Sequence, residues 1–196
     1  MLGLPYLPMQ DFADNPSSRI FWANIPIEKA HSYLLYRHDS DANRLLAQLK
    51  YNHRPDLGRW LGRMMARELR PKGFFTDVEC IIAVPLHWRR HWSRGYNQSY
   101  ELACGVAEVT GLPLLRRQVR RVRNNESQTR KSGEERIQNV QNLFIARPAL
   151  PYRHVLLVDD VLTTGSTLTS CAKALLQANP DVRFSILTLA RAFLIP

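Results

Sequence analysis

The alternation of apolar and polar positions along the chain predicts strands and helices in turn. Apolar residues recur at helical spacing in four windows, which are 40–52, 56–70, 97–111 and 166–178. Short apolar runs of the kind found in buried strands occupy four other windows, which are 32–37, 78–85, 154–159 and 183–191. Strand and helix therefore alternate, and this order predicts an α/β fold with a mainly parallel sheet flanked by helices.

Three other segments give weaker patterns. Residues 112–125 are predicted to form a strand with basic flanks, and 132–143 a short helix that leads into a strand at 144–145. Residues 1–32 contain four of the twelve prolines and show no clear periodicity. We expect them to form an N-terminal extension, followed by one domain over residues 33–196.

The sequence VLLVDDVLTTGSTLTS, residues 155–170, places two acids at the end of a strand and a hydroxyl-rich loop after them. Buried charge needs a partner, so Asp159 and Asp160 must open onto water, a metal or a polar ligand. In parallel sheets, ligands bind outside the carboxyl ends of the strands. The loop there consists of Thr163, Thr164, Gly165, Ser166 and Thr167. Its hydroxyl groups, its glycine and the free N–H groups of the following helix suit a phosphate monoester.

The two acids would repel a phosphate, so they should face a different group. Sugar hydroxyls, or a divalent cation held among oxygens, would satisfy them. A phosphate loop beside two carboxylates that bind hydroxyl groups describes a receptor for a ribose 5-phosphate. The chain contains neither of two other phosphate motifs, G-x-x-x-x-G-K-[ST] and G-x-G-x-x-G. The structural alternative is an ordinary strand–loop–helix corner with exposed acids, which does not require five successive small or hydroxylic residues.

The charge composition indicates which kinds of molecule the protein could bind. The 196 residues include 27 Lys and Arg against 17 Asp and Glu, and the net charge of +10 favours either nucleic acid or a phosphorylated small molecule. No apolar run approaches the roughly 20 residues that a membrane span needs. The first residues lack the basic start of a secretory signal, so we expect a cytoplasmic location and no membrane span.

The stretch VLLVDDVLTTGST resembles the motif of type I phosphoribosyltransferases, which bind phosphoribosyl pyrophosphate (PRPP). The resemblance implies the type I phosphoribosyltransferase fold, with a flexible hood segment over the reacting centre. It also implies that Asp159 and Asp160 hold the ribose 2- and 3-hydroxyls and that residues 163–167 hold the 5-phosphate. Mg²⁺ is implied as an ion bound together with PRPP, and no direct metal ligand in the protein is assigned.

Four segments resemble a narrower group, the ComF/GntX family of competence-associated, type I phosphoribosyltransferase-like proteins. They are LKYNHR at 49–54, VPLHWRRHWSRGYNQS at 84–99, the pattern from Gln128 to Phe144, and LTLARA at 187–192. Together they place the likeness over roughly residues 33–192. Many members carry a four-cysteine zinc module before this domain. This sequence has no C-x-x-C, so the N-terminal extension is expected to lack that module.

The family likeness places pyrophosphate on the loop after the strand 78–85. The candidate ligands are Pro85, Leu86, Arg89, Arg90 and Arg94. Guanidinium groups bind phosphate oxygens at two points, and the alternative is a solvated basic loop without a specific contact. Asn97 either caps the following helix or contacts the ligand. Lys50 lies either within reach of pyrophosphate or at the polar edge of its helix.

The segment 123–136 is polar, long and basic, and it has no apolar anchor. Such a composition suits either a mobile lid, as the family's hood implies, or a disordered surface loop. The candidate hood residues are Gln128, Arg136 and Asn139.

Two functions from different classes follow. The first is a phosphoribosyltransferase that transfers the phosphoribosyl group of PRPP, in the presence of Mg²⁺, to an unknown nitrogenous acceptor in DNA uptake or nucleotide salvage. The second is a non-catalytic protein that uses the same fold to sense PRPP or a nucleotide, or to bind single-stranded DNA on its basic surface. The sequence names neither a general base nor a purine or pyrimidine pocket.

Overall fold

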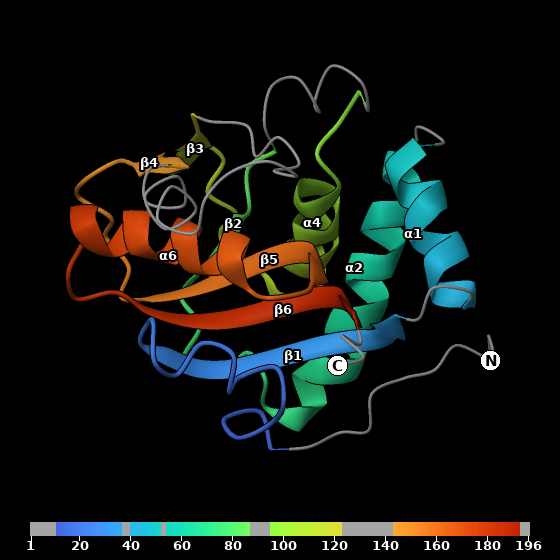
Figure 1. The fold of residues 1–196 in the computed structure, drawn as a ribbon, viewed down its shortest axis with the longest axis horizontal. Coiled ribbons are helices and arrows are strands. Elements are labelled where there is room, and N and C mark those ends of the chain that lie inside the picture. Colours follow the sequence, from blue (N-terminus) through green and yellow to red (C-terminus); the bar gives the residue numbers. More distant parts are fainter. Residues whose placement is uncertain (1–10, 37–39, 52–53, 87–94, 123–142, 193–196) are drawn as a thin grey trace, which may run out of the picture.

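A sheet of four parallel strands forms the centre of the protein (Figure 1). The structure, a computed structural model, describes residues 11–36, 40–51, 54–86, 95–122 and 143–192. The strands are β1 (Ile27–Tyr36), β2 (Cys80–Ala83), β5 (His154–Leu162) and β6 (Arg183–Ala192). They lie in the order β1-β6-β5-β2, and all neighbouring pairs are parallel. The predicted α/β fold with a mainly parallel sheet is confirmed.

Helices cover both faces of this sheet. The first face carries α1 (Asp41–Tyr51), α2 (Pro55–Leu69) and α4 (Gln98–Thr110), and the second carries α6 (Ser166–Ala178) (Figure 1). A short 3-10 helix, η1 (Arg70–Lys72), follows α2 and contains Pro71, a residue type that does not continue an α-helix. Among the described residues, each of these α-helices lies within one residue of its predicted bounds, because each carries its apolar residues at regular helical spacing.

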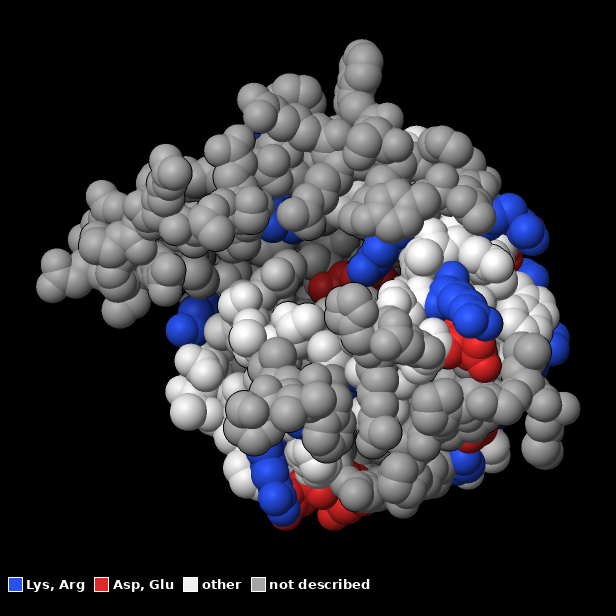
Figure 2. Space-filling view, turned by 45° about the vertical axis from the view of Figure 1, so that its right-hand side comes forward, with Lys and Arg blue, Asp and Glu red and all other residues white. Residues whose placement is uncertain are grey.

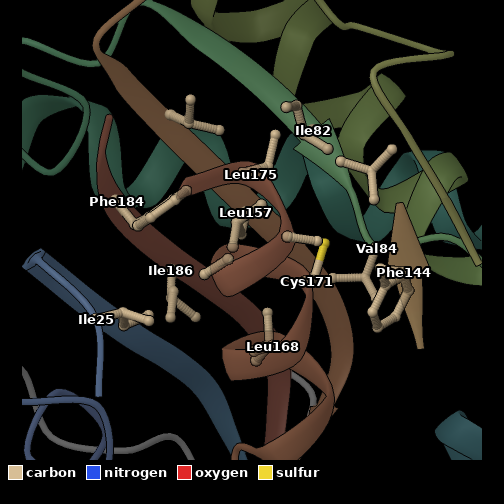
Figure 3. Packing of buried hydrophobic residues seen from close by; sticks show 14 of the residues in the cluster. Ile25, Ile82, Val84, Phe144, Leu157, Leu168, Cys171, Leu175, Phe184 and Ile186 are labelled. Atoms are coloured by element: carbon tan, nitrogen blue, oxygen red, sulfur yellow. The ribbon is translucent and has the colours of Figure 1, made fainter. Parts of the chain in front are cut away.

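The residues of β5 point alternately to the two faces and so contribute to two layers of core. Val155 and Leu157 belong to the layer under α6, whereas Leu156 and Val158 belong to the layer under α2 and α4. Figure 3 shows the first of these layers, in which side chains of α6 and of the sheet meet. Because both faces are covered, β5 is apolar from Val155 to Val158, and its acids follow directly.

A second, antiparallel sheet lies beside α6 (Figure 1). It consists of β3 (Val119–Arg121) and β4 (Phe144–Ala146). Val119 and Phe144 are buried in the same layer as the residues of α6. Arg120 and Ile145 are paired in the register of the two strands, and both are exposed. This small sheet therefore has an apolar side toward α6 and an outer side that carries charge.

The strand predicted over residues 112–125 is wrong in its length. Leu114 forms a single parallel bridge with Ile81 of β2, and within the described part of this stretch, residues 112–122, the strand covers 119–121 and belongs to the second sheet. The intervening Arg116 and Arg117 are exposed, and charged side chains of this kind are rarely buried. The chain therefore leaves the central sheet at these arginines. The helix predicted over 132–143 lies outside the described residues.

Residues 11–26 pack on the central sheet. β1 begins at Ile27, five residues before the predicted strand, and pairs with β6. Ahead of it, Phe21 and Ile25 are buried in the layer under α6. Asn15 anchors this segment, because its side-chain amide donates to the Ala30 carbonyl (2.9 Å). The domain boundary expected after residue 32 therefore falls inside β1.

Candidate functional site

Asp159 and Asp160 lie near the carboxyl end of β5 in different environments. Asp159 is buried, and its Oδ1 accepts hydrogen bonds from the Ser99 hydroxyl (2.7 Å) and from the Asp160 backbone N–H (2.9 Å). In the part of the chain that the structure describes, nothing donates to its Oδ2. Asp160 is half-buried, with 17% of its side chain exposed. The carboxylate of Asp159 is thus held in place by hydrogen bonds inside the protein, and the carboxylate of Asp160 reaches the surface.

A lysine from α1 contacts the acid pair. Nζ of Lys50 lies 3.4 Å from Oδ2 of Asp160. The last turn of α1 is tied to the turn before α4, because the Tyr96 hydroxyl donates to the Leu49 carbonyl. Figure 2 shows acidic side chains recessed near the centre of one face of the protein, with basic side chains beside them. Lys50 therefore does more than occupy the polar edge of its helix, since it balances the charge of Asp160.

The pKa of Asp159 is raised to about 7, first by burial and then by the negative charge of Asp160. The hydrogen bonds from Ser99 and from the Asp160 N–H, together with the charge of Lys50, act in the opposite direction. Asp159 therefore exchanges its proton near neutral pH. A ligand hydroxyl donates more strongly to the carboxylate form, in which both oxygens accept hydrogen bonds.

Replacement of the buried acid should stabilise the protein at alkaline pH. Between the ordinary carboxyl pKa of 3.8 and about 7, folded wild-type protein keeps a proton on Asp159 that the unfolded chain has lost. The contribution of this group to stability is therefore fully present below the ordinary pKa and is lost as the pH rises through about 7. We expect Asp159→Asn to raise the free energy of unfolding near pH 8 by more than about 1 kcal/mol, because one pKa unit corresponds to about 1.4 kcal/mol.

Urea unfolding near pH 5 and near pH 8 measures this effect. The exposed Asp181 offers a matched control, and Asp181→Asn should leave the pH dependence unchanged. An Asp159→Asn protein whose stability follows that of the wild type at both pH values would contradict the assignment of a raised pKa.

The loop after β5 presents its hydroxyl groups to solvent. Thr163, Thr164 and Ser166 are exposed, and Thr167 is half-buried in the first turn of α6. Gly165 is the N-cap of α6 and makes no side-chain cap, and the Ser166 N–H makes a long contact with the Thr164 hydroxyl (3.5 Å). The other N–H groups of the first turn are available to an anion, and the helix dipole favours negative charge there. The five residues predicted to bind phosphate therefore surround one helix end.

The N-terminal segment contacts this loop at Gly165. The φ of Gly165 is 74°, which lies in the left-handed region that favours glycine. A Cβ at this position would lie 2.6 Å from Cγ2 of Ile20 and 2.9 Å from Cε1 of Phe21. Glycine is thus required both by the backbone and by the neighbouring side chains. This close approach fixes the position of the loop relative to the N-terminal segment.

The end of β2 lies next to the acid pair. The Val84 N–H donates to the Val158 carbonyl (2.9 Å), which belongs to the residue before Asp159. The Val84 carbonyl accepts a hydrogen bond from the Asn97 side chain (3.0 Å). Asn97 also caps α4 by accepting from the Ser99 N–H (3.1 Å). Asn97 therefore has the capping role, and it places Ser99 where its hydroxyl reaches Asp159.

Two of the predicted pyrophosphate ligands border a hollow at this end of β2. Pro85 and Leu86 line a space of about 320 Å³ together with Tyr96 and Tyr100. The other predicted ligands, Arg89, Arg90 and Arg94, lie outside the described residues, and their roles stay predictions. The same holds for the hood candidates Gln128, Arg136 and Asn139.

The described residues contain no group of three or more His, Cys, Asp or Glu side chains placed to hold a metal ion. At the acid pair they offer two carboxylates, fewer oxygen ligands than a divalent cation takes in total. Within the same part of the chain, no helix is long and apolar enough to cross a membrane.

Three contacts of the site were missed by the sequence analysis. Ser99 binds Asp159, Lys50 pairs with Asp160, and Ile20 with Phe21 borders Gly165. The available signals were a hydroxyl in the first turn of a helix and a lysine in the last turn of another, and neither pattern indicates a partner. Phe21 could be predicted as an aromatic anchor of the N-terminal extension, but the contact of Ile20 and Phe21 with Gly165 could not, because their segment has no periodicity.

Comparison with known proteins identifies the class of protein. The family model described as the phosphoribosyl transferase domain matches residues 95–192, which include Ser99, the acid pair and the loop. Competence protein F of Haemophilus influenzae is 36% identical over 137 residues, which cover 67% of this chain and 60% of that protein. DNA utilization protein YhgH of Salmonella typhimurium is 35% identical over 136 residues, covering 68% and 60%. Competence protein ComFC of Bacillus subtilis is 30% identical over 112 residues, covering 57% and 44%.

A match over half of the chain defines the fold as that of the type I phosphoribosyltransferases, in agreement with the parallel sheet and its flanking helices. The chain belongs to the phosphoribosyl transferase domain family and, within it, to the ComF family of competence-associated proteins. It spans about three fifths of the length of the first two of these relatives.

Proposed function

We propose that the protein binds PRPP at the carboxyl end of β5 and transfers its phosphoribosyl group to a nitrogenous acceptor. The main support is the position of Asp159 and Asp160 directly beside a hydroxyl-rich loop and an uncapped helix end. Ribose hydroxyls would donate to the carboxylates, and the 5-phosphate would accept from residues 163–167 and the first turn of α6. The ribose of PRPP thus carries the donors and its 5-phosphate carries the acceptors. The site offers carboxylates for the first group and, next to them, hydroxyl and N–H groups for the second.

Transfer from PRPP breaks the bond between C1 of the ribose and the pyrophosphate oxygen. The acceptor nitrogen forms a bond to C1 and loses a proton, and pyrophosphate departs with the bonding electron pair. Negative charge grows on the pyrophosphate during this step, so fixed cations beside it lower the barrier. Lys50 contacts the acid pair and is therefore a candidate for this role. Arg89, Arg90 and Arg94 are the predicted additional cations.

Mg²⁺ belongs to the proposal as an ion bound together with PRPP. The residues present fit this arrangement, because Oδ2 of Asp159 has no donor among the described residues and Asp160 is within reach of solvent. Carboxylate oxygens are ligands that Mg²⁺ accepts, usually alongside substrate phosphates and water. When bound, the ion would supply neutralisation of the pyrophosphate charge.

The names of the relatives extend the proposal to a biological setting. Two are described as competence proteins and one as a DNA utilization protein. We propose the same setting for this chain, in which a phosphoribosyl group or its product nucleotide serves the use of incoming DNA.

Calorimetric titration with PRPP and Mg²⁺ tests the binding step, with ribose 5-phosphate and pyrophosphate as partial ligands. We expect PRPP to bind more tightly than either part, because it occupies both halves of the site. Absence of PRPP binding would remove the proposed function. Release of pyrophosphate in the presence of purine and pyrimidine bases then tests transfer. PRPP binding without release for any base would favour the non-catalytic sensor over the enzyme.

A further inference from the structure

A hollow lined by four arginines lies on the second sheet, apart from the acid pair and the phosphate loop. It has a volume of about 420 Å³ and is formed by the two short strands and the residues next to them. The arginines are Arg116, Arg117, Arg120 and Arg147, and all four are exposed. Ile145, which is exposed, contributes apolar surface to the same hollow. This volume is sufficient for a small-molecule ligand of ordinary size.

The arginine side chains are not neutralised by nearby acids. Among the described residues, none of the four guanidinium groups forms an ion pair, and Arg116 instead stacks over the ring of Tyr100 (5.0 Å). Four positive charges around one hollow make the local potential positive, and this potential favours an anion there. Guanidinium groups bind phosphate oxygens through two parallel N–H donors, which makes phosphate the matching chemistry.

The pairing of β3 with β4 creates this arrangement. Arg120 and Ile145 are register partners on the outer side of the sheet. Val119 and Phe144 bury the opposite side against α6, and this packing prevents the sheet from turning over. Arg117 and Arg147, which flank the strands, come close because the Arg147 N–H donates to the Gln118 carbonyl (2.8 Å). The backbone pairing of β3 with β4 therefore holds the four arginines close together.

The arginine hollow continues toward the proposed PRPP site. It shares Arg116 and Val119 with the hollow at the end of β2, which also contains Tyr96 and Tyr100. Tyrosine rings are suitable partners for a planar base, and arginine adds a cation next to such a ring. Phosphate-binding arginines beside an aromatic wall match the two parts of a nucleotide.

We propose that the arginine hollow binds the phosphate group of a nucleotide whose base lies in the adjoining tyrosine-lined hollow. The bound nucleotide is either free or part of a single strand, since both carry the same phosphate and base. The arginine hollow does not include the loop at residues 163–167, Pro85 or Leu86, so phosphate binding there does not depend on the proposed PRPP function. The adjoining tyrosine-lined hollow does border Pro85 and Leu86.

The matched test compares two double substitutions that remove the same charge. Arg117→Gln/Arg120→Gln alters the hollow, whereas Arg44→Gln/Arg67→Gln removes two exposed arginines of α1 and α2. The probes are adenosine monophosphate, followed by calorimetry, and a fluorescent oligodeoxythymidine of about 12 nucleotides, followed by anisotropy. We expect the first variant to lose at least about tenfold in affinity and the control to lose less than about threefold, since only the hollow makes direct phosphate contacts.

The outcomes distinguish a free nucleotide from a single strand, and they distinguish failure of this inference from failure of the proposed PRPP function. Binding of the monophosphate indicates a free nucleotide, and binding of the oligonucleotide alone indicates a strand, for which the salt slope should fall by about 1.4 in the hollow variant. Equal weakening in both variants, or no binding of either probe to the wild type, would overturn the inference. PRPP titration of the hollow variant should match the wild type, so a failure of PRPP binding in the wild type would count against the proposed function alone.

Discussion

Substitution of both acids of β5 by asparagine should abolish PRPP binding while the fold persists. In Asp159→Asn/Asp160→Asn the side chains keep their size, and the amide oxygen introduced at position 159 can still accept the hydrogen bond from Ser99. The negative charges that the ribose hydroxyls would donate to are lost. Hydrogen bonds to charged groups contribute about 1.5–3 kcal/mol each, so losing two lowers the affinity by at least about 100-fold.

Calorimetric titration with PRPP and Mg²⁺ measures this loss, and circular dichroism shows that the variant is folded. Asp14→Asn/Asp181→Asn is the matched control, because both residues are exposed and the change in net charge is the same. A control that weakens as much as the acid-pair variant would mean that overall charge governs binding. Undiminished binding in the folded acid-pair variant would place the ribose elsewhere.

The acid pair and its loop could be predicted because their chemistry is contiguous. Asp159 to Thr167 spans nine residues, and an apolar strand before it together with a regular helix after it fixes the geometry. The helices could be predicted for a similar reason, since each carries its own periodic signal. The local sequence pattern was thus sufficient to predict the carboxyl end of β5 and the first turn of α6.

The partners of the acid pair could not be predicted because the fold brings them from distant positions. Ser99 is 60 residues from Asp159, and Lys50 reaches Asp160 from another helix. Their contacts depend on how α1 and α4 pack on one face of the sheet, which apolar spacing alone does not specify. The arginine hollow illustrates the same limit, because Arg117 and Arg147 come together only through the pairing of β3 with β4.

Alanine at position 165 should disturb both the stability of the fold and the phosphate loop. The left-handed backbone at φ 74° costs a non-glycine residue about 1–2 kcal/mol. The added Cβ would also lie 2.6 Å from Ile20 and 2.9 Å from Phe21, and overpacking of this kind costs about 1–3 kcal/mol. We therefore expect Gly165→Ala to lower the free energy of unfolding by about 2–5 kcal/mol and to weaken PRPP binding, because the loop must move away from its contact.

Gly111 separates the two causes. Its φ is 77°, nearly the same as that of Gly165, but a Cβ there would meet no atom within 4 Å. Gly111→Ala therefore reports the backbone effect alone, and urea unfolding should show a smaller loss for it than for Gly165→Ala. Ile20→Ala should relieve part of the cost of Gly165→Ala, since it removes the atom that the new Cβ approaches most closely. Equal losses at the two glycines, without coupling to Ile20, would show that the N-terminal segment does not position the phosphate loop.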